Sequence, residues 1–257
     1  MHKLSHEFYF CINAVLSKLS MALLLFVFIL PLGPLAPKAF GAPMGRGDDK
    51  KSSSEEAKFD IYVAGEKIGQ EKFSIKRSMD SIQSSSDMNF RDPGRRNQRI
   101  KIETKLTMDP EYLPKTYKLN SEIDGRKVTM TGTFVSGQAN FEYRLDGIPR
   151  QRGLLVGDNF IMLDTNVFHH FIFVAQLYDF ETDNSHSMEV IIPQALANGI
   201  ITIAGAGIEE TSVGGKKRKL HHLIVDTGSL LIDLWMDSQK TLYKIALPAK
   251  GIEVIRK

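Results

Sequence analysis

The sequence of 257 residues predicts a mainly β protein, a curved antiparallel meander sheet or half-barrel with one plug helix near residues 166–178. Apolar and polar side chains alternate along most segments after Lys58, as in strands with one buried face and one wet face. Turn pairs such as Asp124-Gly125 separate successive strands, which favours antiparallel neighbours. Residues 166–178 are apolar without this alternation. The wet faces exclude a doubly wound parallel sheet.

Residues 1–41 have the pattern of a secretory signal peptide. A basic flank at Lys18 precedes an apolar run from Met21 to Leu30, helix-breaking prolines follow, and the small residues Ala39 and Gly41 precede the expected cleavage site. A single uncleaved membrane anchor is the alternative, since 19 uncharged residues lie between Lys18 and Lys38. We expect an exported protein, periplasmic or on the cell surface, that touches the membrane only through this segment if it is not removed.

Residues 42–57 are polar and charged and lack apolar periodicity, which predicts a flexible leader before a single β half-barrel domain at 58–257. The formal charge of +3 becomes nearly neutral once residues 1–41 are set aside, which gives no electrostatic case for nucleic acid. The only cysteine, Cys11, precedes the apolar run. The exported chain would therefore contain no thiol, which suits a bacterial envelope.

The first half of the domain reads as a series of hairpins. In residues 99–108, Ile100, Ile102 and Leu106 lie on one face and lysines on the other. The same alternation predicts a hairpin about Gly65 and then strands at 78–90, 99–108, 116–123, 127–135 and 139–145. The last third predicts strands at 187–193, 200–205, 207–213, 219–226, 230–237, 241–248 and 251–257. The basic run 214–219 is interpreted as a solvated hairpin tip.

Residues 166–178 interrupt this pattern. Asp164, Thr165 or Asn166 can cap a helix, and no Gly or Pro interrupts the following residues. A helix that is apolar nearly all round must be buried, so we expect a plug against the concave side of the sheet. A buried strand is the alternative.

The run Ile224-Val225-Asp226-Thr227-Gly228-Ser229 resembles the active-site signature of the aspartic peptidases. Those enzymes need two carboxylates that share one proton. The chain contains no second Asp-Thr-Gly or Asp-Ser-Gly, and few residues follow Asp226. We therefore interpret the run as a hairpin turn, with a hydrolase using Asp226 as the alternative.

The histidines occur as two adjacent pairs, His169-His170 and His221-His222, a spacing that does not favour chelation of one ion. No phosphate loop, nucleophile elbow or His-Glu-x-x-His occurs, so we predict a non-enzymatic protein without metal or cofactor. The concave apolar face could hold a lipid or acyl chain, or the plug helix could fill it. His169, His170 and Trp235 are the candidate ligand-binding residues, and a purely structural envelope protein is a further alternative.

The segments 59–75, 163–180, Val190–Gln194 and 234–257 together resemble an uncharacterised exported bacterial protein family, a domain of unknown function. Trp235-Met236-Asp237 followed by a returning strand is also loosely similar to envelope lipoprotein carriers, whose fold is an incomplete β-barrel lined for acyl chains. These resemblances imply a β-rich fold and an exported location, and they assign no residue a role.

Overall fold

The computed structural model describes residues 52–93, 98–182 and 184–257. The predicted signal peptide at 1–41 and residues 42–51 of the predicted leader lie outside the described residues, as do residues 94–97 of the basic loop. No helix in the described ranges combines the length and the apolar character that a membrane crossing requires.

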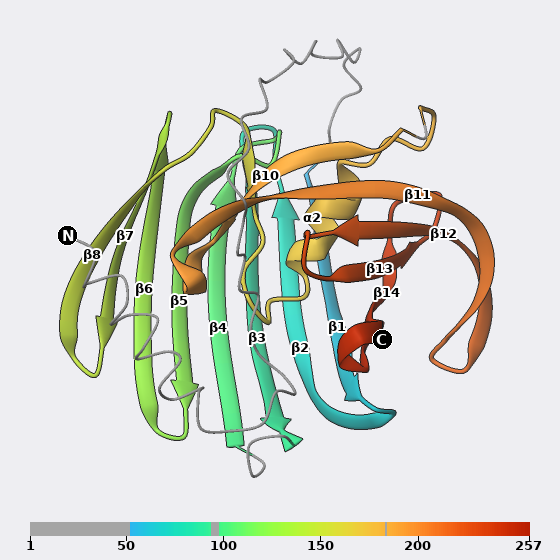
Figure 1. Ribbon diagram of the computed structural model, residues 1–257, viewed down its shortest axis with the longest axis horizontal. Coiled ribbons are helices and arrows are strands. Elements are labelled where there is room, and N and C mark those ends of the chain that lie inside the picture. The colour runs from blue at the N-terminus through green and yellow to red at the C-terminus, as the bar shows by residue number, and fades with distance from the viewer. Residues whose placement is uncertain (1–51, 94–97, 183) are drawn as a thin grey trace.

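The described residues form a single sheet of 15 strands with the order β8-β7-β6-β5-β4-β3-β2-β1-β15-β14-β13-β12-β11-β10-β9 (Figure 1). All neighbours pair antiparallel except β9 and β10, which are parallel. The strands are β1 (Ser53–Val63), β2 (Glu66–Arg77), β3 (Ile82–Asp92), β4 (Gln98–Met108), β5 (Pro114–Ile123), β6 (Arg126–Val135), β7 (Gln138–Leu145), β8 (Ile148–Leu155), β9 (Phe160–Met162), β10 (His186–Ile192), β11 (Ala197–Val213), β12 (Lys216–Asp226), β13 (Leu231–Met236), β14 (Leu242–Leu247) and β15 (Ile252–Arg256).

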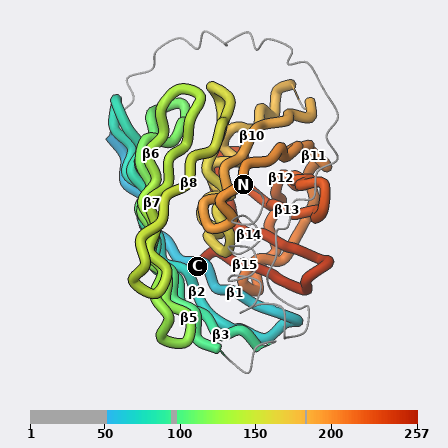
Figure 2. Tube along the Cα trace, turned by 60° about the vertical axis from the view of Figure 1, so that its left-hand side comes forward, coloured from blue at the N-terminus to red at the C-terminus, as the bar shows by residue number. Residues whose placement is uncertain are grey.

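The sheet has two arms that join where β1 pairs with β15. One arm runs from β1 to β8, and the other runs from β15 back to β9. The strands β10 to β13 cross in front of β1 to β4 at a steep angle (Figure 1), and Figure 2 shows the two arms facing each other. The inner face of the curved sheet therefore lies between the arms.

The helix α2 (His170–Gln176) fills the space between the arms, and its residues from His170 to Ala175 are all buried. On β4, Ile100, Ile102 and Leu106 are 1–2% exposed and face this core, while the charged side chains between them are exposed. The predicted fold class is confirmed: a mainly β, curved antiparallel meander with one helix in the region predicted for the plug. The strand alternative for that region is wrong.

Several predicted boundaries differ from the structure. β1 starts at Ser53, five residues before the predicted domain, because residues 53–57 pair with the end of β2 and need no apolar periodicity to do so. The two strands predicted at 200–205 and 207–213 are one strand, β11, with a bulge between Gly205 and Gly207. β8 and β9 were not predicted, because their side chains do not alternate clearly.

The helix is also shorter than predicted. It begins after His169, which makes no side-chain cap hydrogen bond. Asp164 does not cap it, because its carboxylate accepts hydrogen bonds from the N–H groups of Thr165 and Gln194 instead. Asn166 has a φ of 59°, a left-handed conformation that separates Asp164 from the helix.

The predicted turns are confirmed at the hairpin tips. Asp124 and Gly125 have φ values of 48° and 79°, as a type I′ turn requires. Gly214 and Gly215, at 58° and 80°, form the tip before the basic start of β12. The meander register therefore follows turn chemistry that the sequence shows directly.

Candidate functional site

His169 lies at the centre of a buried hydrogen-bonded chain between α2 and strands β2 and β3. Its Nδ1–H donates to Glu71 Oε1 at 2.6 Å, and its backbone N–H donates to Glu71 Oε2 at 3.1 Å. Nε2 and the Ser84 hydroxyl form a further hydrogen bond at 2.7 Å. Glu71 and His169 are 0% exposed and Ser84 is 4% exposed.

The order Ser84–His169–Glu71 is that of a nucleophile, a base and an orienting acid. A catalytic serine must reach its substrate, whereas Ser84 is enclosed under α2. The chain satisfies the polar groups of all three side chains, which is what a buried polar group requires. In this structure the arrangement attaches the start of α2 to the sheet.

His170 belongs to a second buried chain. The Asp164 backbone N–H donates to His170 Nδ1 at 3.2 Å, and the Tyr117 hydroxyl donates to Asp164 Oδ2 at 2.6 Å. The His169 and His170 rings meet edge to face with centroids 4.7 Å apart. The two chains therefore form one polar cluster inside the apolar core.

Burial shifts the acidity of this second chain. Burial, and then the neighbouring His169 ring, hold the pKa of His170 well below its usual value. Burial raises the pKa of Asp164 to about 6, although its hydrogen bond from Tyr117 opposes the shift. Burial and the Asp164 charge raise the pKa of Tyr117. His170 is thus neutral at neutral pH, and its proton is on Nε2 because Nδ1 accepts a hydrogen bond.

Trp235 lies on the opposite face of the sheet from the two histidines. It packs in a small separate cluster with Val213, Leu220 and Ala246. The His222 ring stacks on it with centroids 4.8 Å apart, and its indole N–H donates to Glu209. The structure brings His169 and His170 together but keeps Trp235 away from them.

The inner face of the sheet is filled by α2. Among the described residues, a void beside the helix has a volume of about 40 Å³ and is lined by the Leu163–Phe168 segment, Phe171 and apolar side chains of the sheet. A pocket for a small ligand usually has at least about 300 Å³. A ligand in the concave face would therefore have to displace the helix.

Asp226 lies at the tip of the β12–β13 hairpin, as the turn interpretation predicts. Its exposed carboxylate accepts the Gly228 N–H at 2.7 Å. The Thr227 hydroxyl accepts the Leu230 N–H, and Gly228 has a φ of 78°. The side chain of Asp226 thus stabilises a turn, a common use of Asp before Gly.

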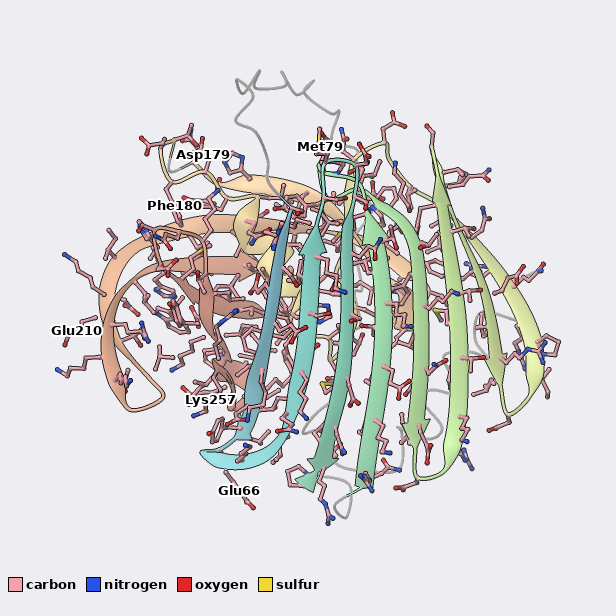
Figure 3. All side chains as sticks on the ribbon, turned by 180° about the vertical axis from the view of Figure 1, so that it is seen from behind. Glu66, Met79, Asp179, Phe180, Glu210 and Lys257 are labelled. Atoms are coloured by element: carbon pink, nitrogen blue, oxygen red, sulfur yellow. The ribbon has the colours of Figure 1, made fainter. Side chains whose placement is uncertain are left out.

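A groove of about 1050 Å³, here called the outer groove, crosses the solvent-facing side of the β1–β8 arm. Figure 3 shows this side of the arm, with Lys257 beside β1 at one end. Two rows of side chains flank the groove. The first row contains Glu56, Ser74, Ser85, Lys105, Lys118, Thr131, Glu142 and Gln151, and the second contains Lys58, Lys72, Asp87, Glu103, Asn120, Thr129, Arg144 and Pro149.

The two rows follow from strand register. Each member of the first row is paired with the next member on the neighbouring strand, and the second row is built in the same way. The residues between the rows, such as Phe73 and Met130, point into the core, so their backbone forms the floor. Eight strands at a spacing of about 4.8 Å give the groove a length of about 34 Å.

Lys105 and Lys118 lie directly opposite each other near the middle of the groove. Neither lysine forms an ion pair with any residue that the structure describes. Like charges directly opposite on neighbouring strands are destabilising, so an anion between them would relieve the repulsion. Hydroxyl and amide side chains, among them Thr129 and Asn120, lie near this pair together with the carboxylates of Asp87 and Glu103, and the hydroxyls and amides can donate further hydrogen bonds.

Across the part of the chain that the structure covers, no three His, Cys, Asp or Glu side chains gather as a metal site. The sequence reasoning missed the outer groove, although it placed its lysines on the wet faces of predicted strands. Two cations at matching positions of adjacent strands were the available signal. Using that signal requires the register between β4 and β5.

Comparison with solved structures identifies a similar fold. A beta-barrel-like protein of a domain of unknown function, DUF1849, from Brucella abortus aligns with a TM-score of 0.55 and 10% identity, covering 79% of this chain and 94% of that chain. A DUF1089 family protein from Pseudomonas aeruginosa aligns with a TM-score of 0.38 and 13% identity, over 80% and 95% of the two chains. The sequence matches no family model and no curated protein. The first likeness shows a barrel-like β fold and assigns no activity.

Proposed function

We propose that this chain is a non-enzymatic exported protein of the cell envelope that binds an acidic polysaccharide along the outer groove. The observation that carries the proposal is the unpaired Lys105 and Lys118 couple in the middle of the groove. Export rests on the pattern of residues 1–41. The absence of catalysis rests on the enclosure of Ser84 and on the turn role of Asp226.

The chemistry of the two rows supports a polar, extended ligand. The hydroxyls and amides can bind sugar hydroxyl groups, and the lysines can bind carboxylates or phosphates through charge-assisted hydrogen bonds. Neither row contains an aromatic side chain. Stacking on aromatic rings is the usual way to bind single-stranded nucleic acid, so the absence of such rings from the rows argues against that ligand.

The lipophilic ligand expected from the sequence fits this geometry less well. An acyl chain gains its binding energy from apolar surface, whereas the side chains of the two rows are mostly charged, hydroxyl or amide groups. The concave face offers apolar surface, but α2 covers it. The loose similarity to lipoprotein carriers therefore supports the shape of the sheet more than a lipid cargo.

A binding titration with fluorescently labelled polygalacturonate tests the proposal. We expect saturable binding that weakens with added salt, because exposed charges are screened. The double variant Lys105→Glu/Lys118→Glu should bind at least about tenfold more weakly. Lys216→Glu/Lys219→Glu, which makes the same charge change at the β11–β12 tip, should bind like the wild type.

Three results would contradict the proposal. One is equal binding by both double variants. Another is binding of poly-glutamate that is tighter than that of polygalacturonate and is lost in Lys105→Glu/Lys118→Glu, which would indicate a protein ligand in the outer groove. The third is stoichiometric displacement of a fluorescent fatty acid from the purified protein, which would restore the lipid hypothesis.

A further inference from the structure

Within the described ranges, strand β8 forms one edge of the 15-stranded sheet and pairs only with β7. Six of its eight residues are exposed, including Ile148 at 58% and Leu155 at 81%. The strand at the other edge, β9, has three residues, all buried. An edge strand presents unpaired backbone groups, which makes β8 a template for strand addition.

The direction of the free backbone groups of β8 follows from two hydrogen bonds. The Val156 N–H donates to Gly137 O on the β7 side, and Asn198 Nδ2 donates to Leu155 O from the other side. Backbone groups of successive strand residues point to opposite sides. Pro149, Gln151, Gly153 and Leu155 therefore face the open edge, and Gln151, Gly153 and Leu155 carry N–H donors.

The side chains along this edge are cationic. Arg150 and Arg152 lie opposite Tyr143 and Phe141, so both point to the same face of the sheet. Neither arginine forms an ion pair among the described residues. Gly153 follows the two arginines in β8 and has no side chain that could obstruct a neighbouring strand. Acidic side chains at alternate positions of an added strand would lie directly opposite the arginines.

We propose that the β8 edge is a docking site for an extended acidic segment of a partner protein, bound by addition of a strand. A second copy of this chain is a poorer occupant. Antiparallel pairing of two β8 strands centred on Gln151 or Arg152 places arginine opposite arginine, and like charges so placed repel. Opposite charge on the partner removes this repulsion and adds charge-assisted hydrogen bonds. Recognition by main-chain pairing with side-chain selectivity at alternate positions is an established mode.

The test uses the full chain and a labelled eight-residue peptide that alternates glutamate and valine. We expect the peptide to bind and to slow amide hydrogen exchange at Gln151, Gly153 and Leu155. Exchange at Arg150 and Arg152, whose amides face β7, should not change. A peptide that alternates lysine and valine should bind at least about tenfold more weakly.

Two variants separate the backbone from the charge. Gly153→Pro removes one donor at the open edge and should abolish the exchange protection while the thermal midpoint stays near the wild-type value. Arg150→Gln/Arg152→Gln should weaken binding and reduce its salt dependence. Lys105→Glu/Lys118→Glu should leave peptide binding unchanged, which separates this site from the outer groove. Equal binding of both peptides, or a wild-type dimer that Gly153→Pro converts to a monomer, would overturn the proposal.

Discussion

At the scale of single residues, Glu71 is notable as a carboxylate in the apolar core. Its carboxylate is fully buried and accepts both the ring N–H and the backbone N–H of His169. A buried charge is tolerated only where hydrogen bonds replace those of water. One residue thus fixes the orientation of a histidine and the position of the segment that enters α2.

Replacing Glu71 with Gln should lower the free energy of unfolding by about 2–3 kcal/mol, because an amide can accept only one of these two hydrogen bonds with its single oxygen. Urea unfolding at neutral pH measures the loss. Glu66→Gln, at an exposed position of the same strand, should change stability by less than about 0.5 kcal/mol. A Glu71→Gln variant as stable as the wild type would show that the carboxylate does not hold the helix.

His170 should make stability depend on pH. Its pKa is well below the usual value in the folded protein, so only the unfolded chain gains a proton as pH falls below about 6.5. The folded state therefore loses stability on acidification, by up to about 1.4 kcal/mol per pH unit from this group. Asp164 acts in the opposite direction between about pH 6 and pH 4, because its raised pKa lets the folded state bind a proton first.

Comparison with His170→Gln isolates the histidine, because Asp164 is present in both proteins. The difference in free energy of unfolding, wild type minus variant, should fall as pH is lowered from about 7 to about 5. Urea titrations at several pH values measure it. Parallel curves for the two proteins would mean that His170 binds a proton equally in the folded and the unfolded state.

At the scale of elements, α2 is too short to be stable alone and depends on contacts at both ends. Lys240 Nζ donates to the carbonyls of Gln176 and Tyr178 and so satisfies the end of the helix. Burial lowers the pKa of this lysine. Arg77 and Tyr112 both donate to the Gln176 side chain. Strands β2 and β13–β14 thus hold the helix through polar contacts while its other side chains fill the core.

Truncation of Phe173 to Ala should destabilise the protein by about 3–5 kcal/mol, because the ring is 1% exposed and a cavity would remain. Leu177→Ala, at a residue 37% exposed, should cost less than about 1 kcal/mol. Guanidinium unfolding of both variants checks the difference. A small loss for Phe173→Ala would mean that the helix is loosely packed and that a ligand could displace it.

The sequence predicted elements better than contacts between them. Alternation of Ile100, Ile102 and Leu106 with charged residues identified β4, because the period of two is local. The polar cluster was not predictable: His169 meets Glu71 across 98 positions of the chain. Whether a histidine in an apolar segment contacts a carboxylate depends on the folded sheet, so this contact could not be predicted from the sequence.

At the scale of the whole molecule, pairing of the strands aligns their alternating polar side chains into one extended surface. The outer groove exists because eight strands keep one register, so that residues from Glu56 to Gln151 fall into line. The predicted antiparallel meander is confirmed, and its turns were readable from Asp-Gly pairs. The pairing of β1 with β15 and the register of that pair could not be predicted, because no turn connects those two strands.

The pairing of β1 with β15 also sets an order of events during synthesis. Each arm is a chain of hairpins that can form as soon as its own strands leave the ribosome. The junction, in which Phe59 lies opposite Arg256, cannot form until β15 has been made. Until then both flanks of the seam are open edges that can associate with other chains. Addition of β15 to β1 is therefore the step that joins the two arms into one sheet.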